Sequence, residues 1–482
     1  MHDMEDDMED TNPVDRKAMP DLEAVVTTSL GEVVGSPPRL YKRRFYGLAS
    51  IFLSNAVLAW AWLSFAMVND LAQERFGVDA TAINWFSNIY SLAFAPFFFS
   101  GWFINRYGIK KSLLVAISGT VAGNWLRYGG VVISSYPLAM AGQALLGVSQ
   151  LFIVPLPMSY SNMWFGPDQR VLPTTIGSLA TTVGSMLGSI ATPYMTPTVD
   201  SLPRAVLIVS IISTVTSALA IFVPAEPPTP ALYNVQEPSN AQRLSRRESI
   251  KLLSKSLEFW LLAITFIISL GIFNTWSTLL FLYLTPYGFP ATDVGLTAGL
   301  FTGVGVSIAL FLAPLIDKWK LHVPVAKVTA SGVTVGYVVF IWIPQVQSRA
   351  FAFTVGTLMG VFSSIFVSVA LELLAELLYP VPEEFCATFV WCVGNLISVP
   401  ITYGLNAGAN PNGNPPGEMK ASLIAQAVLA IALVALPINL LGLFGRKEKT
   451  RFFRREHQIP NSLAVARGIT SLYLLDLAAT LT

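Results

Sequence analysis

Two carboxylates four residues apart inside a long apolar run are the residues of this sequence best suited to chemistry. Glu372 and Glu376 lie in the run 350–378, and residues four apart share one face of a helix. Acidic side chains within a membrane are costly and usually functional. Glu372, one turn deeper in the run, could bind a cation or take up a proton. Glu376, near the end of the run, could do the same or form a structural pair with a basic residue.

Other reactive residue types are sparse or badly placed for catalysis. The three histidines lie outside the apolar runs, at positions 2, 322 and 457, and the two cysteines, Cys386 and Cys392, fit as small apolar filling of one run. A metal or haem site built on these residues is therefore not expected. The sequence has no Walker A motif and no clustered catalytic set such as HExxH. We expect no enzyme, no ATP-driven pump, no metal and no cofactor.

The composition shows what kind of protein must position these residues. Of the 482 residues, 53% are hydrophobic and only 12% are charged, with a mean hydropathy of +0.57. A soluble protein usually has about 25% charged residues, so a soluble enzyme is excluded. The net charge is +1 and the basic residues form short clusters, which excludes a nucleic-acid-binding protein. We therefore expect a polytopic membrane protein embedded in the lipid bilayer.

Twelve apolar runs are long enough to cross a membrane, since a spanning helix needs roughly 20 mostly apolar residues. They are 46–69, 82–104, 112–133, 137–160, 172–194, 204–224, 257–284, 293–316, 323–344, 350–378, 384–406 and 420–444. A string of glycines, Gly177, Gly184 and Gly188, lies in the fifth run and predicts close helix packing.

These runs fall into two groups of six, which predicts an all-α membrane protein of two six-helix bundles. The bundles cover 45–224 and 257–444, and a Pro-rich, then basic, linker at 225–256 joins them. Residues 1–44 and 445–482 are expected to be tails, the second at the surface, disordered, or carrying an interfacial helix. Two six-span halves joined by a long polar loop resemble the layout of the major facilitator superfamily.

The distribution of Lys and Arg predicts the orientation, because basic residues concentrate on the cytoplasmic side. Only five of the 30 basic residues fall in the predicted outer segments and their margins: Arg75, Arg127, Arg204, Arg349 and Lys420. Both termini are therefore expected in the cytoplasm. Arg127, near the outer end of the third run, is expected to reach the outer headgroups or to pair with an acidic loop residue.

A polar turn between the second and third runs is a candidate gate. Gly101, Asn105, Arg106, Gly108 and Lys110 have the spacing of the facilitator motif GxxxD(R/K)xG(R/K)(R/K), with Asn105 in place of the usual Asp. Gly108 suits a tight turn, and the basic residues could lock the inner gate by charge pairing. The alternative is an ordinary basic turn that obeys the positive-inside rule.

The equivalent turn of the second half, after the eighth run, carries a degenerate copy of this motif. Its polar residues are Asp317 and Lys318, which we include in the candidate gate. A similar motif in both halves favours the gate interpretation.

Finer sequence elements resemble the solute carrier 49 family, the relatives of the feline leukaemia virus subgroup C receptor. They are Ile83-Asn84-Trp85, Gly142-Gln143, Trp164-Phe165-Gly166-Pro167 and the stretch from Glu376 to Tyr379-Pro380, and the resemblance covers about residues 43–445. Members are described as choline and ethanolamine transporters, and earlier as haem exporters. The resemblance therefore implies transport of a small polar or cationic solute.

The resemblance also implies which residues contact the solute. Trp62 matches an aromatic residue that holds a quaternary ammonium by a cation–π contact, and Gln150 matches an amide of the family. Asn274 stands where the family has a second aromatic residue, a Tyr, and Asn395 where it has a Gln. Whether Trp276, two residues on, replaces the lost ring is left open. With Glu372, these residues make up the predicted substrate-binding set: Trp62, Gln150, Asn274, Glu372 and Asn395.

The expected function is alternating-access transport of a small-molecule solute by a monomer, with the plasma membrane as its location. Uniport and proton coupling both remain open. The alternative function is a membrane receptor or nutrient sensor that binds the same solute without net transport. The gate motif favours transport.

Overall fold

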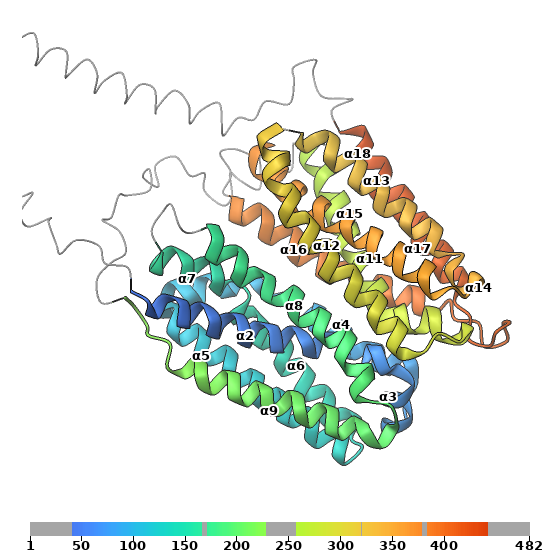
Figure 1. Cartoon of the computed structure of the whole chain (residues 1–482), viewed down its shortest axis with the longest axis horizontal. Coiled ribbons are helices and arrows are strands. Elements are labelled where there is room, and N and C mark those ends of the chain that lie inside the picture. The colour runs from blue at the N-terminus through green and yellow to red at the C-terminus, as the bar shows by residue number, and fades with distance from the viewer. Residues whose placement is uncertain (1–40, 166–170, 228–256, 320, 378–382, 442–482) are drawn as a thin grey trace, which may run out of the picture.

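The structure is a computed structural model that describes residues 41–165, 171–227, 257–319, 321–377 and 383–441 (Figure 1). Across these residues the chain is helical, and the one β-contact is an isolated bridge between Asn410 and Glu418. The predicted all-α class is confirmed. Most of the linker 225–256, nearly all of both tails, and the motif residues Gly166, Pro167, Tyr379 and Pro380 lie outside the described residues.

The described helices fall into two groups, blue to green and yellow to red in Figure 1. The first group contains α2 (Arg43–Leu63), η1 (Ala66–Val68), α3 (Asn69–Phe76), α4 (Ala80–Leu92), α5 (Phe97–Val132), α6 (Tyr136–Ile153), α7 (Leu156–Trp164), α8 (Val171–Met195), η3 (Val199–Ser201) and α9 (Leu202–Ile221). The second contains α11 (Leu257–Leu284), η5 (Thr285–Tyr287), α12 (Ala291–Trp319), α13 (His322–Phe340), α14 (Ile343–Val346), α15 (Arg349–Leu377), α16 (Glu383–Asn406), α17 (Lys420–Ala430), η6 (Ile431–Ala435) and α18 (Leu436–Leu440).

Each predicted apolar run is helical over most of its described residues. Within the described part of the chain, 9 helical segments are long and apolar enough to cross a membrane. The runs 82–104, 112–133 and 172–194 are helical as well, in α4 with the start of α5, in the rest of α5, and in α8. Gly108 has φ 82° and ψ 168° and breaks α5 into two parts, so the turn expected at this glycine is present.

Glycines let α8 pack directly on the backbone of α2. A Cβ atom on Gly184 would overlap the carbonyl group of Ala56, and one on Gly188 would lie 2.7 Å from the carbonyl oxygen of Trp60. Gly177 makes a similar contact with Pro157 of α7. The packing role predicted for this glycine string is confirmed, because real Cβ atoms do not approach other atoms so closely.

A second glycine string joins the two bundles. Gly295, Gly299 and Gly303 of α12 face α8, where added Cβ atoms would overlap the carbonyl oxygen of Ser189 and the side chains of Ile190 and Met186. Residues four apart lie on one helix face, so these glycines form a continuous stripe. We call this contact between α8 and α12 the glycine seam.

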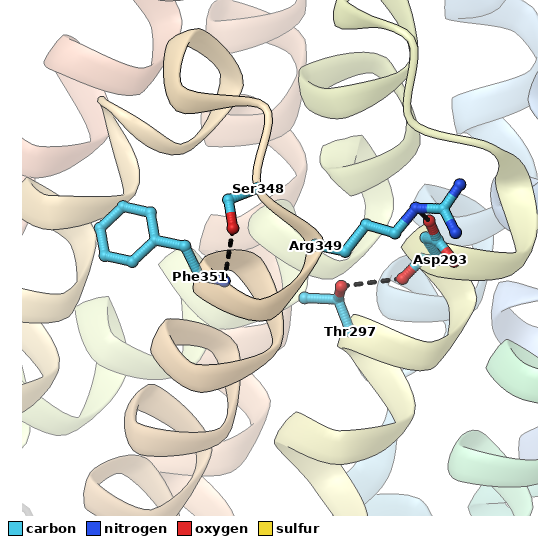
Figure 2. Close-up of polar contacts among 5 residues, drawn as sticks. All are labelled: Asp293, Thr297, Ser348, Arg349 and Phe351. Atoms are coloured by element: carbon cyan, nitrogen blue, oxygen red, sulfur yellow. Dashed lines mark hydrogen bonds and ion pairs between the residues drawn. The ribbon is translucent and has the colours of Figure 1, made fainter.

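An ion pair joins α12 and α15 of the second bundle where these two helices begin. Arg349 Nε lies 2.7 Å from Asp293 Oδ2 (Figure 2). Thr297 donates its hydroxyl to the carbonyl oxygen of Asp293 at 2.8 Å. The Arg349 side chain is 67% exposed, and exposed ion pairs typically contribute only about 0–1 kcal/mol. The pair therefore orients two helix ends more than it stabilises the fold.

Arg127 does not reach the outer headgroups, and that prediction was wrong. The residue is 1% exposed and lies inside the first bundle. Its guanidinium donates to Ser64 Oγ and to Asn124 Oδ1, and it lies 4.5 Å from the centroid of the Phe65 ring. Ser64 and Phe65 lie between α2 and η1. Their side chains, together with that of Asn124, provide the arginine with partners inside the bundle.

The α2–α8 contact yields a stability prediction. Gly184→Ala should destabilise the protein by about 1–3 kcal/mol, the usual effect of overpacking a close contact, because the Ala56 backbone cannot move aside without shifting α2. The measurement is thermal unfolding of the purified protein in detergent. Gly404→Ala is the matched control, since no atom lies within 4 Å of the added methyl. Equal melting temperatures for the two variants would contradict the packing argument.

Candidate functional site

A cavity of about 2220 Å³ lies between the two bundles. Its lining comes from both halves: α2, α4 to α8, α11, α12, α15 and α16. Four residues of the predicted substrate-binding set are among the lining residues: Trp62 of α2, Gln150 of α6, Asn274 of α11 and Asn395 of α16. The tertiary structure therefore brings together side chains more than 330 positions apart in sequence.

The described lining combines apolar and polar side chains and carries no charge. Among the described residues that line the cavity there is no Asp, Glu, Lys, Arg or His. Hydroxyl groups line one side, with Thr174, Ser178, Thr181 and Ser185 all on α8. A cavity of this kind can desolvate a solute without a buried counter-charge.

Aromatic rings form a wall beside Trp62. The ring centroids of Trp62 and Phe273 are 6.5 Å apart, and Phe273 stacks on Phe301 at 5.1 Å with an angle of 18° between the planes. All three residues line the cavity, whereas Trp276 is 0% exposed and packs behind Phe301. Trp276 therefore does not replace the ring lost at position 274. Phe273, which sequence reasoning missed, faces the cavity one residue earlier.

Three amide side chains also line the cavity, and each is held by a hydrogen bond to the protein. Asn274 Nδ2 donates to Asn395 Oδ1 at 3.0 Å, and Asn395 Nδ2 donates to the carbonyl oxygen of Trp391 at 2.8 Å. Gln150 Nε2 donates to the carbonyl oxygen of Tyr90 at 2.6 Å. In the described part of the chain, no protein donor reaches the side-chain oxygens of Asn274 and Gln150. These two oxygens are therefore available to accept hydrogen bonds from a solute.

Glu372 lies outside this group. It is half-buried on α15, and the cavity lining includes its neighbours Leu371 and Ser368 but not Glu372 itself. Its role in solute or proton binding stays a prediction. The side chain of Glu376 lies outside the described part of the protein.

The cavity occupies only one end of the two bundles. It reaches Gly108 in α5 and Trp260 near the start of α11. Toward the other end, the described lining stops at Tyr90 on α4 and at Asn395 on α16. The conformation is therefore open toward the helix ends that carry the basic clusters and closed at the opposite end.

The candidate gate residues lie at the open end. Gly101, Asn105 and Gly108 line the cavity, and the Lys110 ammonium donates to the carbonyl oxygens of Ile221 and Val223, at the end of α9. A cation at a helix C-terminus is stabilised by the exposed carbonyls.

Two basic residues of the candidate gate point into solvent. Arg106 and Lys318 are exposed at their turns, and the side chain of Asp317 lies outside what the structure describes. Their role as a gate stays a prediction.

Two bundles of apolar helices around a large cavity, with no charged residue in its described lining, define a multi-pass membrane carrier. The chain belongs to the Major Facilitator Superfamily, whose family model matches residues 49–385.

Individual relatives resemble the chain over most of its length. A Danio rerio protein named choline/ethanolamine transporter flvcr2b is 25% identical over 382 residues, which cover 76% of this chain and 78% of that protein. Solute carrier family 49 member A3 of Danio rerio is 27% identical, covering 78% of this chain and 81% of that protein. The predicted resemblance to solute carrier 49 is confirmed.

The fold also matches solved transporters. A bacterial homolog of the human lysosomal transporter Spinster, solved in an inward-facing and occupied conformation, superposes with a TM-score of 0.63 at 13% identity. The match covers 86% of this chain and 99% of that one. The predicted two-bundle fold is therefore confirmed, and the family and its relatives support transport over the receptor alternative.

The contact between Lys110 and α9 can be tested by substitution. Lys110→Met should lower stability by about 1 kcal/mol, because the last carbonyls of α9 lose a charged donor. Thermal unfolding in detergent measures the effect. Lys111→Met is the control, since its ammonium lies 5.7 Å from the Tyr107 ring and no helix end depends on it. A Lys110→Met variant as stable as the control would count against this cap.

Proposed function

We propose that this protein is a facilitative transporter of a small organic cation of the choline and ethanolamine class. One observation carries the proposal: the cavity is walled by Trp62, Phe273 and Phe301 beside the amides of Asn274 and Gln150, with no charged residue in its described lining. The names of the relatives, which are about 25% identical, point to the same class of solute.

The chemistry of the lining suits a cation that must be released again. Aromatic faces attract a quaternary or primary ammonium by about 0.5–2 kcal/mol each, and the amide oxygens of Asn274 and Gln150 accept from N–H or O–H groups of the solute. A buried carboxylate would bind the cation more strongly and slow its release. The uncharged lining therefore favours passage over retention.

Transport follows from a change in which end of the cavity is open. The two bundles rock against each other around the solute, and the present conformation is open toward the basic helix ends. We place these ends and both termini in the cytoplasm, at the plasma membrane. The working unit is one chain, with the bundles at 45–224 and 257–444. It acts without a chemical step, cofactor or nucleic acid.

The aromatic wall predicts the effect of removing Trp62. Trp62→Ala should weaken choline binding by about two- to thirtyfold, the change that a lost cation–π contact of ordinary strength produces. Trp62→Phe should retain part of the affinity. Uptake of labelled choline into proteoliposomes, measured as a function of concentration, tests both.

Trp60→Phe is the matched control, because Trp60 points away from the cavity and donates to Thr192 Oγ1 at 3.2 Å. Choline uptake that is unaffected by Trp62→Ala would overturn the proposed binding wall. Uptake of no amine by the unsubstituted protein would overturn the proposed substrate class.

The uncharged lining also predicts the driving force. A cation that crosses without a counter-charge moves net charge, so an inside-negative membrane potential should accelerate choline uptake. An imposed pH gradient should leave the rate unchanged, both in the unsubstituted protein and in Glu372→Gln. Proteoliposomes with separately clamped potential and pH provide the measurement. A pH-driven uptake that Glu372→Gln abolishes would instead assign proton coupling to Glu372.

A further inference from the structure

A chain of hydrogen bonds crosses between the bundles at the closed end of the cavity. Asn84 Nδ2 in α4 donates to Asn406 Oδ1, the last residue of α16, at 3.0 Å. Asn406 Nδ2 donates back to Thr81 Oγ1 in α4 at 2.8 Å. One asparagine of the second bundle is thus held by two residues of the first, one turn apart.

Further amides of the first bundle support this contact. Asn69 Nδ2 donates to Asn84 Oδ1 at 3.1 Å, and Gln73 Nε2 donates to Asn69 Oδ1 at 2.7 Å. Asn69 and Asn84 are 0% and 1% exposed. Because both ends of the Asn84 amide are bonded, its orientation toward Asn406 is fixed.

One face of α4 shows where these hydrogen bonds lie relative to the cavity. Thr81, Asn84, Asn88 and Ser91 follow one another at steps of three or four residues, so they lie on the same side of the helix. Ser91 lines the cavity and Asn84 bonds across the bundles. The two residues are seven positions apart, about 10 Å along the helix. The amide contact therefore closes the cavity at the end where its lining stops.

Helix α16 likewise carries a cavity-lining residue and, further along the same face, a residue that bonds to the other bundle. Asn395 lines the cavity, and Asn406 lies eleven residues further on, about 16 Å along the helix. Eleven residues are close to three full turns, so both side chains face the same direction. The two helices thus carry solute-facing residues at one level and bundle-to-bundle hydrogen bonds at the next.

We propose that Thr81, Asn84 and Asn406 form an outer latch, the hydrogen bonds that must break before the cavity can open at its closed end. The proposal rests on the proposed transport function, because a latch has meaning only in a protein that alternates between two open ends. Neutral amides suit this task. They give a directional contact that aligns the bundles on closing, yet they leave no unpaired charge when they separate and water reaches them.

The glycine seam completes the closure on the other side of the cavity but works differently. Gly295, Gly299 and Gly303 meet α8 by close contact, which requires shape and no particular bond. Of these two contacts, the amide contact is the one that a single side-chain substitution can weaken. Its removal should therefore shift the balance between the two conformations without rebuilding the interface.

A labelling experiment in intact cells tests the latch directly. Asn88→Cys, introduced together with Cys386→Ala and Cys392→Ala, places a thiol between the latch and the cavity, at a residue that is 4% exposed. A membrane-impermeant maleimide added outside the cell then reports how often the outer end opens. Asn406→Leu should raise the labelling rate by about tenfold, which corresponds to about 1.4 kcal/mol in the opening equilibrium.

The matched control is Asn412→Leu, the same change at an exposed asparagine of the loop that follows α16. It should leave the labelling rate unchanged. If Asn406→Leu labels no faster than Asn412→Leu, the latch is overturned. The outcome does not depend on any solute, so faster labelling in a protein that moves no amine would support the latch and overturn only the proposed substrate.

A reversible cross-link provides a second test with a different readout. Asn84→Cys and Asn406→Cys, in the background lacking Cys386 and Cys392, are joined by a short bis-methanethiosulfonate reagent. Choline uptake should stop on cross-linking and return when dithiothreitol removes the reagent. The background protein with neither new cysteine should be unaffected by both reagents. Uptake that continues in the cross-linked protein would overturn the latch.

Discussion

Polar side chains at membrane depth have no water to pair with, and the structure depends on pairing them inside the protein. Asn69, Asn84 and Gln143 are each at most 1% exposed, and each donates to an oxygen on another helix. A buried amide without a partner costs about 1–3 kcal/mol, so these bonds restrict how the helices rotate and slide. Apolar contacts hold the bundles together, while the buried amides determine which helix faces meet.

Arg127 shows how the same constraint accommodates a charge. Its guanidinium is bonded to Ser64 and Asn124 and lies against the Phe65 ring. Two of these residues, Ser64 and Phe65, belong to the break that follows α2. Trp62, which lines the cavity, precedes this break directly, and Asn69, which supports the latch, follows it. One interruption of a membrane helix therefore positions residues of both functional regions.

In the cavity, this pairing is incomplete for two amides. The amide nitrogens of Asn274 and Gln150 are bonded to the protein, and both residues line the cavity together with aromatic rings. A bound solute would donate hydrogen bonds to the amide oxygens of these two residues, and the aromatic rings would take the place of the water around its ammonium group. At the closed end, by contrast, the amides are paired within the protein, because Asn84 donates to Asn406 across the bundles. The same side-chain chemistry thus serves binding at one level and closure at the next.

The sequence by itself determined the class of protein, the helical runs, the turn at Gly108 and the packing of Gly184 and Gly188, because hydropathy and backbone freedom are local properties. A family resemblance added Trp62, Gln150, Asn274 and Asn395 as candidates. Only the tertiary structure decided that Phe273 and not Trp276 faces the cavity, that Arg127 is turned inward, and that Asn84 meets Asn406, 322 positions away. These outcomes depend on the rotation and depth of one helix relative to another. No periodicity within a single run specifies that relation, since it is set by the contacts that all the helices make together.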